Sequence, residues 1–560
     1  MSIPVIDIFA GPGGLGEGFS QHFNEQGDRV FDIKLSIEKD PKAHETLRLR
    51  SFFRQFPNEQ APDAYYEIIR QKNWKNRKAL IDELKASYPK EWVKADKEAW
   101  CFELPYPEEF YKKGKKKGKK KGGYTSDEII QRNTEIDLRI KQALNGENNF
   151  LLIGGPPCQA YSLVGRSRNQ GISDDDHRVH LYKEYLRIIA KHHPSIFVME
   201  NVKGLLSSEV KGQKIFDLMK EDLRDPSSIY PEFKSPKYNI YSFTSEPDTH
   251  DEDGPVYKSN KSYLIKSERF GVPQKRHRVI LLGIREDLEH PDLYLESKDG
   301  IDLKSIIGKL PKIRSVINRS FEGYHPTKKY ANGKPKRLYK NLKDSKKLWE
   351  NLLSDQIKKL KEWGNLSLDE LNDNIKVSQY DTGSEFIKCG NTIDDDHQLS
   401  GWYLDSKLDG VANHESRSHL TQDLMRYMFA VMYVEKHGEF PRMNDYAKYH
   451  RDLLPHHENA KSGDFTDRFR VQLPTEPATT VTSHISKDGH YFIHYDPRQC
   501  RSLTVREAAR IQTFPDNYLF CGSRTAQYHQ VGNAVPPFLA FQIAKIVKKV
   551  FEVNYGGTSK

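Results

Sequence analysis

The sequence predicts an α/β fold built around a doubly wound, mostly parallel sheet. Short apolar runs that fit buried strands alternate with amphipathic segments of helical spacing, which is the pattern of a sheet covered by helices. A glycine-rich turn follows the first apolar run, and an acid ends the second run about twenty residues later. The expected strands lie at residues 3–10, 35–38, 150–153, 195–199 and 279–283.

The first strand runs directly into the glycine-rich turn at residues 11–18. Glycines at a strand-to-helix turn allow the backbone to approach a ligand closely, and the next helix presents unpaired N–H groups. Glu38 ends the second strand, where mononucleotide-binding folds place an acid that accepts hydrogen bonds from ribose hydroxyls. Taken singly, these features are also compatible with a tight turn and a solvated acid.

A cysteine follows the third expected strand. Two prolines precede Cys158 in the segment 154–159, so the thiol is held at the exit of a buried run. This is a suitable position for a nucleophile, although a lone cysteine is more often structural. Glu200 ends the fourth strand, at the sheet edge where open α/β folds bind ligands.

Three long polar side chains precede or begin the fifth strand. Gln274, Arg276 and Arg278 alternate along the chain, so an extended backbone places them on one face. A basic strand edge is usually solvated. Here the three side chains converge beside a core strand.

Together these segments resemble the C5-cytosine-specific DNA methyltransferase family of the bacterial restriction-modification type. The resemblance covers both ends of the chain, but not most of residues 41–125 or 285–475. The blocks that carry it stand in the family's order at residues 7–14, 155–159, 200–202, 274–278, 501–515 and 532–537.

The resemblance implies a Rossmann-like, S-adenosylmethionine-dependent methyltransferase domain with an inserted target-recognition domain. The enzyme would methylate carbon 5 of a flipped-out cytosine in a specific duplex DNA sequence. Cys158 would attack carbon 6, Glu200 would contact N3 and the exocyclic amine, and Arg278 would contact O2, with Arg276 and Gln274 in support. The other implied contacts are Phe9, Gly11, Gly13, Gly14, Leu15, Glu38, Pro157, Asn533 and Val535 for the cofactor, and Pro156, Gln159, Ser162 and Gln274 for the substrate.

One family feature has no clear counterpart. Relatives usually carry an acid before the catalytic cysteine that contacts the adenine amino group of the cofactor. Asp127 is a weak candidate, displaced by a long insertion. The adenine contact therefore stays open at this point.

The expected organisation is a catalytic domain at residues 1–284, a target-recognition domain at 285–475, and a C-terminal catalytic part at 476–560. A charged insertion occupies about 41–125 and includes a Lys/Gly tract at 112–123, which is either a spacer or a phosphate-binding segment. Within 285–475 we expect helices near 346–363 and 419–435. The polar segment 413–419 is interpreted equally as a DNA-facing surface or a solvated helix start. The last helix, within 537–551, should pack beside the glycine-rich turn.

Composition is consistent with this assignment. The 560 residues carry a formal net charge of +10, which suits a polyanionic partner. The five cysteines form no Cys-x-x-Cys pair, which favours a reducing compartment, and the histidines show no zinc-type spacing. The sequence shows neither a membrane-spanning apolar run nor a signal peptide. We therefore expect a soluble, cytoplasmic protein that is a monomer. The resemblance further implies that it binds the nucleoid through DNA and that a companion restriction endonuclease exists, which need not contact it.

Alternative functions remain at this stage. An RNA-directed enzyme of the same fold is one, although the long recognition region and the Gly-Pro-Pro-Cys-Gln context favour DNA. A non-catalytic nucleic-acid-binding relative is a second, but it would have no chemical need to keep Cys158, Glu200 and Arg278 together. A cysteine hydrolase is weaker, because no histidine is clearly positioned as the base.

Overall fold

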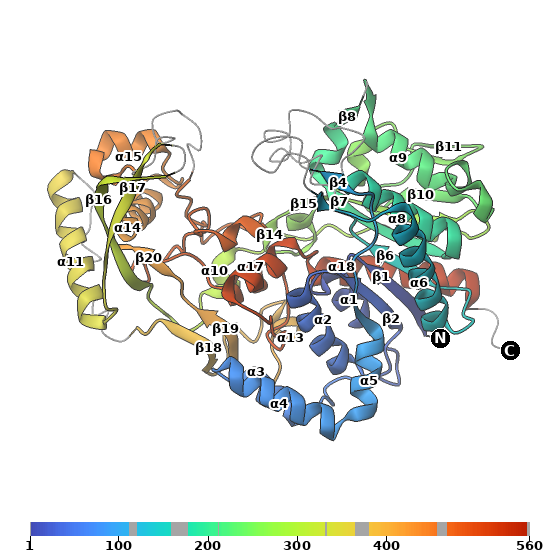
Figure 1. The fold of residues 1–560 in the computed structure, drawn as a ribbon, viewed down its shortest axis with the longest axis horizontal. Helices are drawn as coiled ribbons and strands as arrows, with labels where there is room; N and C mark the ends of the chain where they lie inside the picture. Colours follow the sequence, from blue (N-terminus) through green and yellow to red (C-terminus); the bar gives the residue numbers. More distant parts are fainter. Residues whose placement is uncertain are drawn as a thin grey trace.

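The computed structural model describes residues 2–110, 120–157, 177–210, 212–330, 333–364, 380–455 and 468–556. Within these residues the central element is a mixed sheet in the order β10-β15-β7-β6-β1-β2-β3, with β13 paired to β15 (Figure 1). Its strands are β1 (Ile3–Ile8), β2 (Phe31–Glu38), β3 (Ala99–Cys101), β6 (Leu151–Gly154), β7 (Ile196–Val202), β10 (Tyr238–Ser242), β13 (Leu264–Lys266) and β15 (His277–Arg285).

The predicted doubly wound, mostly parallel sheet is confirmed. β1 lies between β2 and β6 and is parallel to both, β3 extends the sheet beyond β2, and β7 follows β6 in the same direction. β15 runs antiparallel to β7 and β10. The carboxyl ends of the five parallel strands therefore meet at one edge of the sheet, where open α/β folds bind their ligands.

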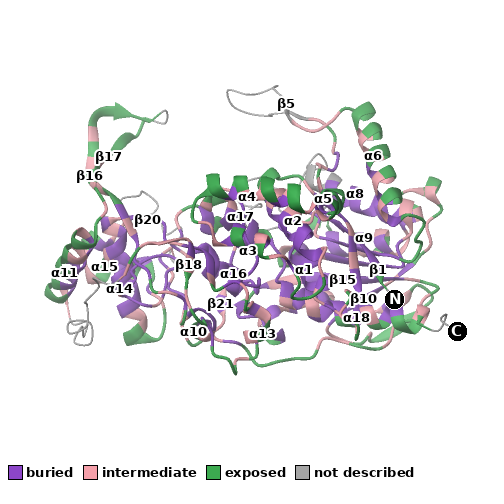
Figure 2. Cartoon of the chain, turned by 90° about the horizontal axis from the view of Figure 1, so that it is seen from below, coloured by how far each residue is buried: buried purple, intermediate pink, exposed green. Residues whose placement is uncertain are grey.

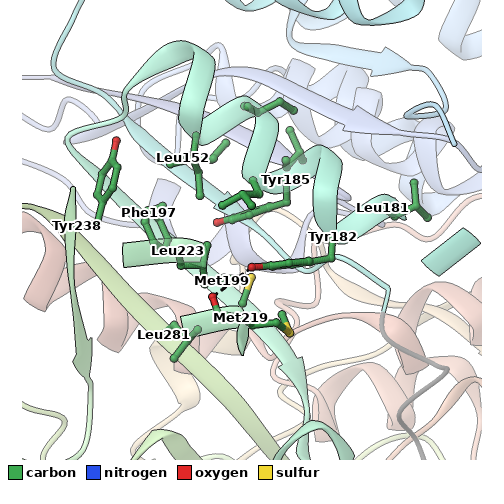
Figure 3. Close-up of a cluster of buried hydrophobic side chains, with 14 of the residues drawn as sticks. Leu152, Leu181, Tyr182, Tyr185, Phe197, Met199, Met219, Leu223, Tyr238 and Leu281 are labelled. Carbon is green, nitrogen blue, oxygen red and sulfur yellow. Dashed lines mark hydrogen bonds between the residues drawn. The ribbon is translucent and has the colours of Figure 1, made fainter. Parts of the chain in front are cut away.

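Helices cover both faces of the sheet because its strands alternate between two cores. In β7, Phe197 and Met199 face one cluster while Ile196 and Val198 face the other. The first cluster packs against α6 (Ser126–Leu144), α8 (His177–His192) and α9 (Ile215–Arg224). Figure 3 shows part of it, where Tyr182 donates a hydrogen bond to the Met219 carbonyl at 3.2 Å. The second cluster packs against α1 (Gly14–Ser20) and α18 (Pro537–Tyr555).

The two ends of the chain meet where α1 contacts α18. A Cβ atom on Gly18 would lie 2.3 Å from the Pro537 carbonyl oxygen and 2.5 Å from the Ala540 Cβ, so the helices approach this closely only because residue 18 is glycine. His22 contributes a 2.7 Å contact between its Nε2 and the Phe541 carbonyl oxygen. The last helix thereby closes the core that the first strand begins.

Residues 41–101 supply part of the main sheet. They form α2 (Pro41–Arg54), α3 (Asp63–Arg70), α4 (Trp74–Ser87), α5 (Pro89–Glu98) and then β3. α2 is joined to α1 by a buried ion pair, in which Arg50 contacts both carboxylate oxygens of Glu17 at 2.5 and 2.8 Å. A stretch that the sequence suggests is an insertion therefore includes an edge strand of the sheet and the helices that lead to it.

A second group of elements, the outer group, comprises β16, β17, α11, β20, α14 and α15 and lies at the far end of the molecule from the sheet (Figure 1). The predicted helices near 346–363 and 419–435 are present as α11 and α14, which pack together around Trp349, Tyr427 and Phe429. The elements between β15 and the C-terminal part are α10 (Leu303–Ile307), β16 (Val316–Lys329), β17 (Pro335–Asn341), α11 (Lys346–Trp363), β18 (Gly383–Lys388), α13 (Ser400–Tyr403), β19 (Gly410–Glu415), β20 (Ser418–Leu420), α14 (Thr421–His437) and α15 (Met443–Tyr449).

The C-terminal part contains α16 (Val505–Ile511) and α17 (Arg524–Asn533) before α18. Both interpretations of the polar segment 413–419 are wrong, because its Asn413 and His414 are buried in β19 against this part. Asn413 exchanges hydrogen bonds with the Phe520 backbone, and His414 contacts Thr504 Oγ1 at 2.9 Å. These polar side chains bind neighbouring segments of the protein and are not free to face DNA or solvent.

The remaining short strands of the described residues form antiparallel pairs, except for β14 and β21, which pair in parallel. No helix among those residues is both long and apolar enough to cross a membrane. The short strands are β4 (Glu109–Phe110), β5 (Lys120–Gly122), β8 (Glu209–Val210), β9 (Gln213–Lys214), β11 (Thr249–Asp251), β12 (Gly254–Val256), β14 (Gln274–Lys275) and β21 (Ala478–Thr479).

Candidate active site

A cavity of about 700 Å³ opens at the carboxyl edge of the parallel strands. Its walls come from the ends of β1, β2, β3, β6 and β7, from the start of β15, and from α17. This volume lies in the range of about 300–1,000 Å³ that is usual for sites of small molecules and cofactors. The predicted site residues that line it are Phe9, Gly11, Gly14, Leu15, Glu38, Pro156, Pro157, Glu200, Arg276, Arg278, Asn533 and Val535.

The turn after β1 forms one wall. Phe9 has a left-handed backbone with φ of 59°, an arrangement that costs energy for a residue with a side chain and is concentrated at functional sites. Gly13 caps α1 with φ of 96° but does not line the cavity. A Cβ atom on Gly14 would lie 2.4 Å from the Val535 carbonyl oxygen. Glycine at residue 14 therefore lets the N-terminal turn touch the segment 532–535.

Glu38 is held on the opposite side of this turn by two backbone groups. Its Oε2 accepts the Gly11 N–H at 2.8 Å, and its Oε1 accepts the Asp40 N–H at 2.7 Å. Burial raises the pKa of the Glu38 carboxyl, although the two backbone hydrogen bonds oppose that shift. The carboxyl is thus fixed in orientation, with lone pairs available to a ligand in the cavity.

Glu200 and Arg278 form an ion pair inside the cavity. The Arg278 Nε lies 2.8 Å from the Glu200 Oε1, and both side chains are largely buried. The antiparallel register produces this pair, because Arg278 lies opposite Val202 and Ile280 opposite Glu200. A Cβ atom on Gly155 would lie 3.0 Å from the Glu200 Oε2, so the carboxylate sits directly against the segment that leads to Cys158.

Arg276 is buried beside this pair. Its Nη1 donates to the carbonyl oxygens of Val481 at 2.8 Å and Gly532 at 3.3 Å. Burial lowers the pKa of its guanidinium well below the usual range, and the nearby positive charge of Arg278 adds to the effect. The Nε of Arg276 has no hydrogen-bond partner within the described residues, although the residue lines the cavity. A buried donor of this kind suits a polar ligand.

Gln274 supports the site from behind and does not line the cavity. It is fully buried, donates from Nε2 to Gln512 Oε1 at 2.8 Å, and accepts the Val481 N–H at 2.6 Å. Gln274 and Arg276 therefore hold the same loop, near Val481, against the start of β15. The Gln274 side chain thus forms its hydrogen bonds within the protein, and it does not lie where the predicted contact with the substrate would require it.

Cys158, Gln159 and Ser162 lie outside the described residues. The chain is described as far as Pro157, which lines the cavity together with Pro156. Among the described residues, no group of three or more His, Cys, Asp or Glu could hold a metal ion.

The sequence reasoning missed the segment after β3. Phe102 and Glu103 line the cavity beside Glu38, and the Phe102 N–H donates to the Glu38 carbonyl at 2.9 Å. The Glu103 carboxylate contacts Lys39 Nζ at 3.2 Å and accepts the Tyr124 hydroxyl at 2.9 Å. The signal was weak because β3 has only three residues in a highly charged stretch. Asp127, the weak sequence candidate, is exposed in the first turn of α6 and does not line the cavity.

Comparison with known families agrees with this site. The family model described as C-5 cytosine-specific DNA methylase matches residues 123–549, which span every block of the resemblance except the N-terminal turn. The chain belongs to this family. It is therefore a DNA (cytosine-5-)-methyltransferase, and its family is one of S-adenosylmethionine-dependent enzymes acting on DNA.

Individual relatives cover much of the same chain. A type II methyltransferase of Bacillus paralicheniformis is 32% identical, over 98% of this chain and 100% of its own length. A type II methyltransferase of Desulfomicrobium norvegicum is 26% identical, over 72% of this chain and 73% of its own length. A DNA (cytosine-5-)-methyltransferase of Aeropyrum pernix is also 26% identical, over 73% and 83%. The match to the first relative extends across the sheet and the outer group of elements alike.

Proposed function

We propose that this DNA methyltransferase modifies a flipped-out cytosine in a specific duplex sequence through a covalent adduct with Cys158. The observation that carries the proposal is the Glu200–Arg278 pair, which stands against Gly155 in the same cavity as the glycine-rich turn and Glu38. This arrangement places a carboxyl, a guanidinium and the segment leading to a cysteine around one space large enough for a base and a cofactor.

The covalent step solves a problem of reactivity, because carbon 5 of cytosine is a poor nucleophile. The Cys158 thiolate adds to carbon 6 and forms a C–S bond, while the ring electron pair moves toward carbon 5 and N3. Carbon 5 would then take the methyl group as the bond between that group and the sulfonium sulfur of S-adenosylmethionine breaks, which would leave S-adenosylhomocysteine. Loss of the proton on carbon 5 restores the double bond to carbon 6 and expels the thiolate, which returns the enzyme to its starting state.

Glu200 and Arg278 act on the polar edge of the same base. The Glu200 carboxylate, which pairs with Arg278 in the free enzyme, contacts N3 and accepts a hydrogen bond from the exocyclic amine, and a proton held between it and N3 offsets the charge that develops as sulfur adds. Arg278 contacts O2 and keeps the Glu200 carboxyl in position through their 2.8 Å contact. Arg276 and Gln274 position these groups through the loop near Val481.

The cavity also fits the methyl donor. S-adenosylmethionine, when bound, supplies the electrophilic methyl group. The turn at Phe9–Gly14 and the segment at 533–535 would enclose it, and Glu38 would accept its ribose hydroxyls. Phe102 and Glu103 are the residues that we assign to its adenine, because they line the cavity immediately beyond Glu38.

The biological role that we propose is protection of DNA in a restriction-modification system, with a companion endonuclease that cuts the unmethylated sequence. Two of the relatives are named type II methyltransferases, which supports this role. We further propose that residues 285–475 contain the target-recognition part, since the catalytic blocks all lie outside them.

The mechanism can be tested with a base that traps the adduct. Bisulfite sequencing of DNA from cells that express the protein first identifies the target sequence. A duplex with 5-fluorocytosine at that position, incubated with enzyme and S-adenosylmethionine, should form a complex that survives denaturing electrophoresis. Methyl transfer can proceed on this base, but the elimination lacks a proton to remove, so the C–S bond persists.

The adduct should map to the peptide that contains Cys158 and should disappear in Cys158→Ala. Cys389→Ala is the matched control, because Cys389 does not line the cavity, and it should trap the duplex as the native protein does. If the native enzyme binds this duplex and no trapped species forms, the covalent mechanism is wrong.

A further inference from the structure

The β16–β17 hairpin projects from the outer group of elements. β20 pairs with β16 only as far as Arg319, and beyond that point β16 pairs with β17 alone. Residues 320–329 extend this two-stranded arm by at most roughly 33 Å, at about 3.3 Å per residue. Figure 2 shows the arm standing away from the body, with most of its length exposed. A two-stranded ribbon that is exposed on both faces has little stability of its own.

The arm carries an unusual concentration of positive charge. Residues 316–341 contain seven lysines and arginines against one acid, Glu322, a net charge of +6 where the whole chain has +10. The outer half of the arm includes Lys328, Lys329, Lys336 and Arg337, which are all exposed. Large exposed side chains lie among them: Tyr324 is 49% and Leu338 41% exposed. A solvated spacer does not require both a net charge of +6 and large exposed side chains. A polyanion bound to the arm would neutralise that positive charge.

The base of the arm is fixed to the protein. Gln422, in the first turn of α14, accepts the Phe321 N–H at 3.2 Å and donates to the Phe321 carbonyl at 3.0 Å. Phe321 packs against Tyr324 and Tyr339, with ring centroids 5.5 and 5.9 Å apart. The arm therefore leaves α14 in a defined direction, which allows its charges to act on a partner held at a definite place.

We propose that the β16–β17 arm binds duplex DNA beside the target sequence, with its basic residues on the phosphates. The proposal rests on the proposed function, which supplies the duplex. A two-stranded ribbon fits the major groove of B-DNA, about 12 Å wide, and lysines along its edges then reach the phosphates on both sides. Phosphate contacts position a protein without reading sequence, so the arm supplies affinity and register.

The test compares the salt dependence of DNA binding in two quadruple variants. In the arm variant, Lys328, Lys329, Lys336 and Arg337 are each changed to serine. In the control, the same change is made at Lys75, Lys78, Lys90 and Lys94, which are exposed on α4 and α5. Both variants keep the Lys/Gly tract at 112–123, so its contribution cancels. Dissociation constants for one target duplex are measured over a series of salt concentrations.

We expect the slope of log affinity against log salt to flatten in the arm variant by roughly 0.9 for each side chain that contacts a phosphate, up to about 3.6 in all. The control should keep the native slope. At saturating DNA the arm variant should keep the native kcat and sequence preference, since the cavity is unchanged. Equal melting temperatures of the three proteins would show that the arm variant is folded.

A second measurement does not depend on removing charge. A photo-crosslinking residue at position 336 should attach to a labelled target duplex, whereas the same residue at position 94 should not. An unchanged salt slope together with no crosslink would overturn the proposal, and attachment to RNA in preference to duplex DNA would assign the arm another partner. If instead the native protein methylates no duplex, the proposed function fails. The slope and the crosslink still report on the arm.

Discussion

The Asp7 carboxyl is buried in β1, with 1% of the residue exposed, and neither of its oxygens has a hydrogen-bond partner in the described part of the chain. Burial raises its pKa to about 8, while the positive charge of Arg54 opposes the shift. The neutral form fits this environment because a Cβ on Gly16 would lie only 3.2 Å from the Asp7 Oδ2. α1 therefore packs tightly over a carboxyl that water does not reach.

The Asp7 carboxyl should cause the free energy of unfolding to fall as pH rises. The unfolded chain ionises Asp7 near its ordinary pKa of 3.8, whereas the folded protein holds the proton up to about 8. Its stabilising contribution is thus complete below pH 3.8 and is lost as pH rises through 8. When the pH is raised from about 5 to about 8, the free energy of unfolding measured with urea should fall less for Asp7→Asn than for the native protein.

The matched control is Asp82→Asn, since Asp82 is exposed on α4 and is ionised throughout this pH range. It should show the native dependence on pH. Parallel curves for Asp7→Asn and the native protein would mean that Asp7 is already ionised in the folded state.

Most of the site residues that the sequence indicated follow or begin a recognisable apolar strand, whereas Asn533 and Val535, at and just beyond the end of α17, came from the family resemblance alone. Glu38 and Glu200 are examples at strand ends, and both line the cavity. Glu103 could not be found in this way because Ala99 is the only fully buried residue of β3, and an alternating pattern cannot be recognised over three residues. The buried state of Gln274 also escaped prediction, since its partners Gln512 and Val481 lie more than 200 residues away in the chain.

The contact between α1 and α18 is determined by the absence of a side chain at residue 18. Five of the seven residues of α1 are glycine or apolar, but only at Gly18 would a Cβ meet three atoms of α18 within 2.6 Å. Two of these atoms belong to the backbone, at Pro537 and Phe541, so no change of rotamer could relieve the overlap.

Gly18→Ala should therefore destabilise the protein by about 1–3 kcal/mol, the usual cost of overpacking a core. Gly401→Ala is the control, because Gly401 lies in α13 with nothing within 4 Å of the added Cβ. Alanine there should be neutral or slightly stabilising through the entropy of the unfolded chain. Melting curves of both variants measure the difference, and equal destabilisation of the two would contradict the close approach.

The sequence predicted best those helices in which apolar residues repeat at helical spacing over several turns. It predicted worst the short strands within polar sequence. α11 coincides with the expected segment 346–363, because Trp349, Leu353, Ile357 and Leu360 repeat at helical spacing. The buried strand β19 was not predicted, because its Asn413 and His414 satisfy their hydrogen bonds through residues 504–520, which no local pattern can reveal.

The hydrophobic cores do not divide at the chain positions where composition changes. Ile393, Leu399 and Tyr403 belong to the same core as Leu503 and other residues of the C-terminal part. Phe386, Leu408 and Ala412 pack instead with residues of α2 and α3. The segment 383–415 therefore packs with the catalytic side of the molecule, although it lies within the range that we assign to target recognition.

A graft that respects these cores should transfer specificity. Replacing residues 316–382 and 416–475 with those of a relative of different target sequence, while keeping 383–415, should move methylation to the relative's site. Bisulfite sequencing measures the outcome. A second chimera that exchanges all of 285–475 should change specificity too, but unfold at a lower temperature because it interrupts two shared cores. Continued methylation of the original sequence by both chimeras would place recognition elsewhere.

The meeting of α1 with α18 has a consequence during synthesis. The apolar face that α1 shares with Leu539, Ile543 and Val547 stays uncovered until these residues of α18 have left the ribosome. At about 5–20 residues per second, the interval between synthesis of Gly18 and Pro537 is roughly half a minute to two minutes. During that interval the nascent chain exposes the apolar face of α1, and the core beneath the catalytic sheet cannot form completely until α18 has been synthesised.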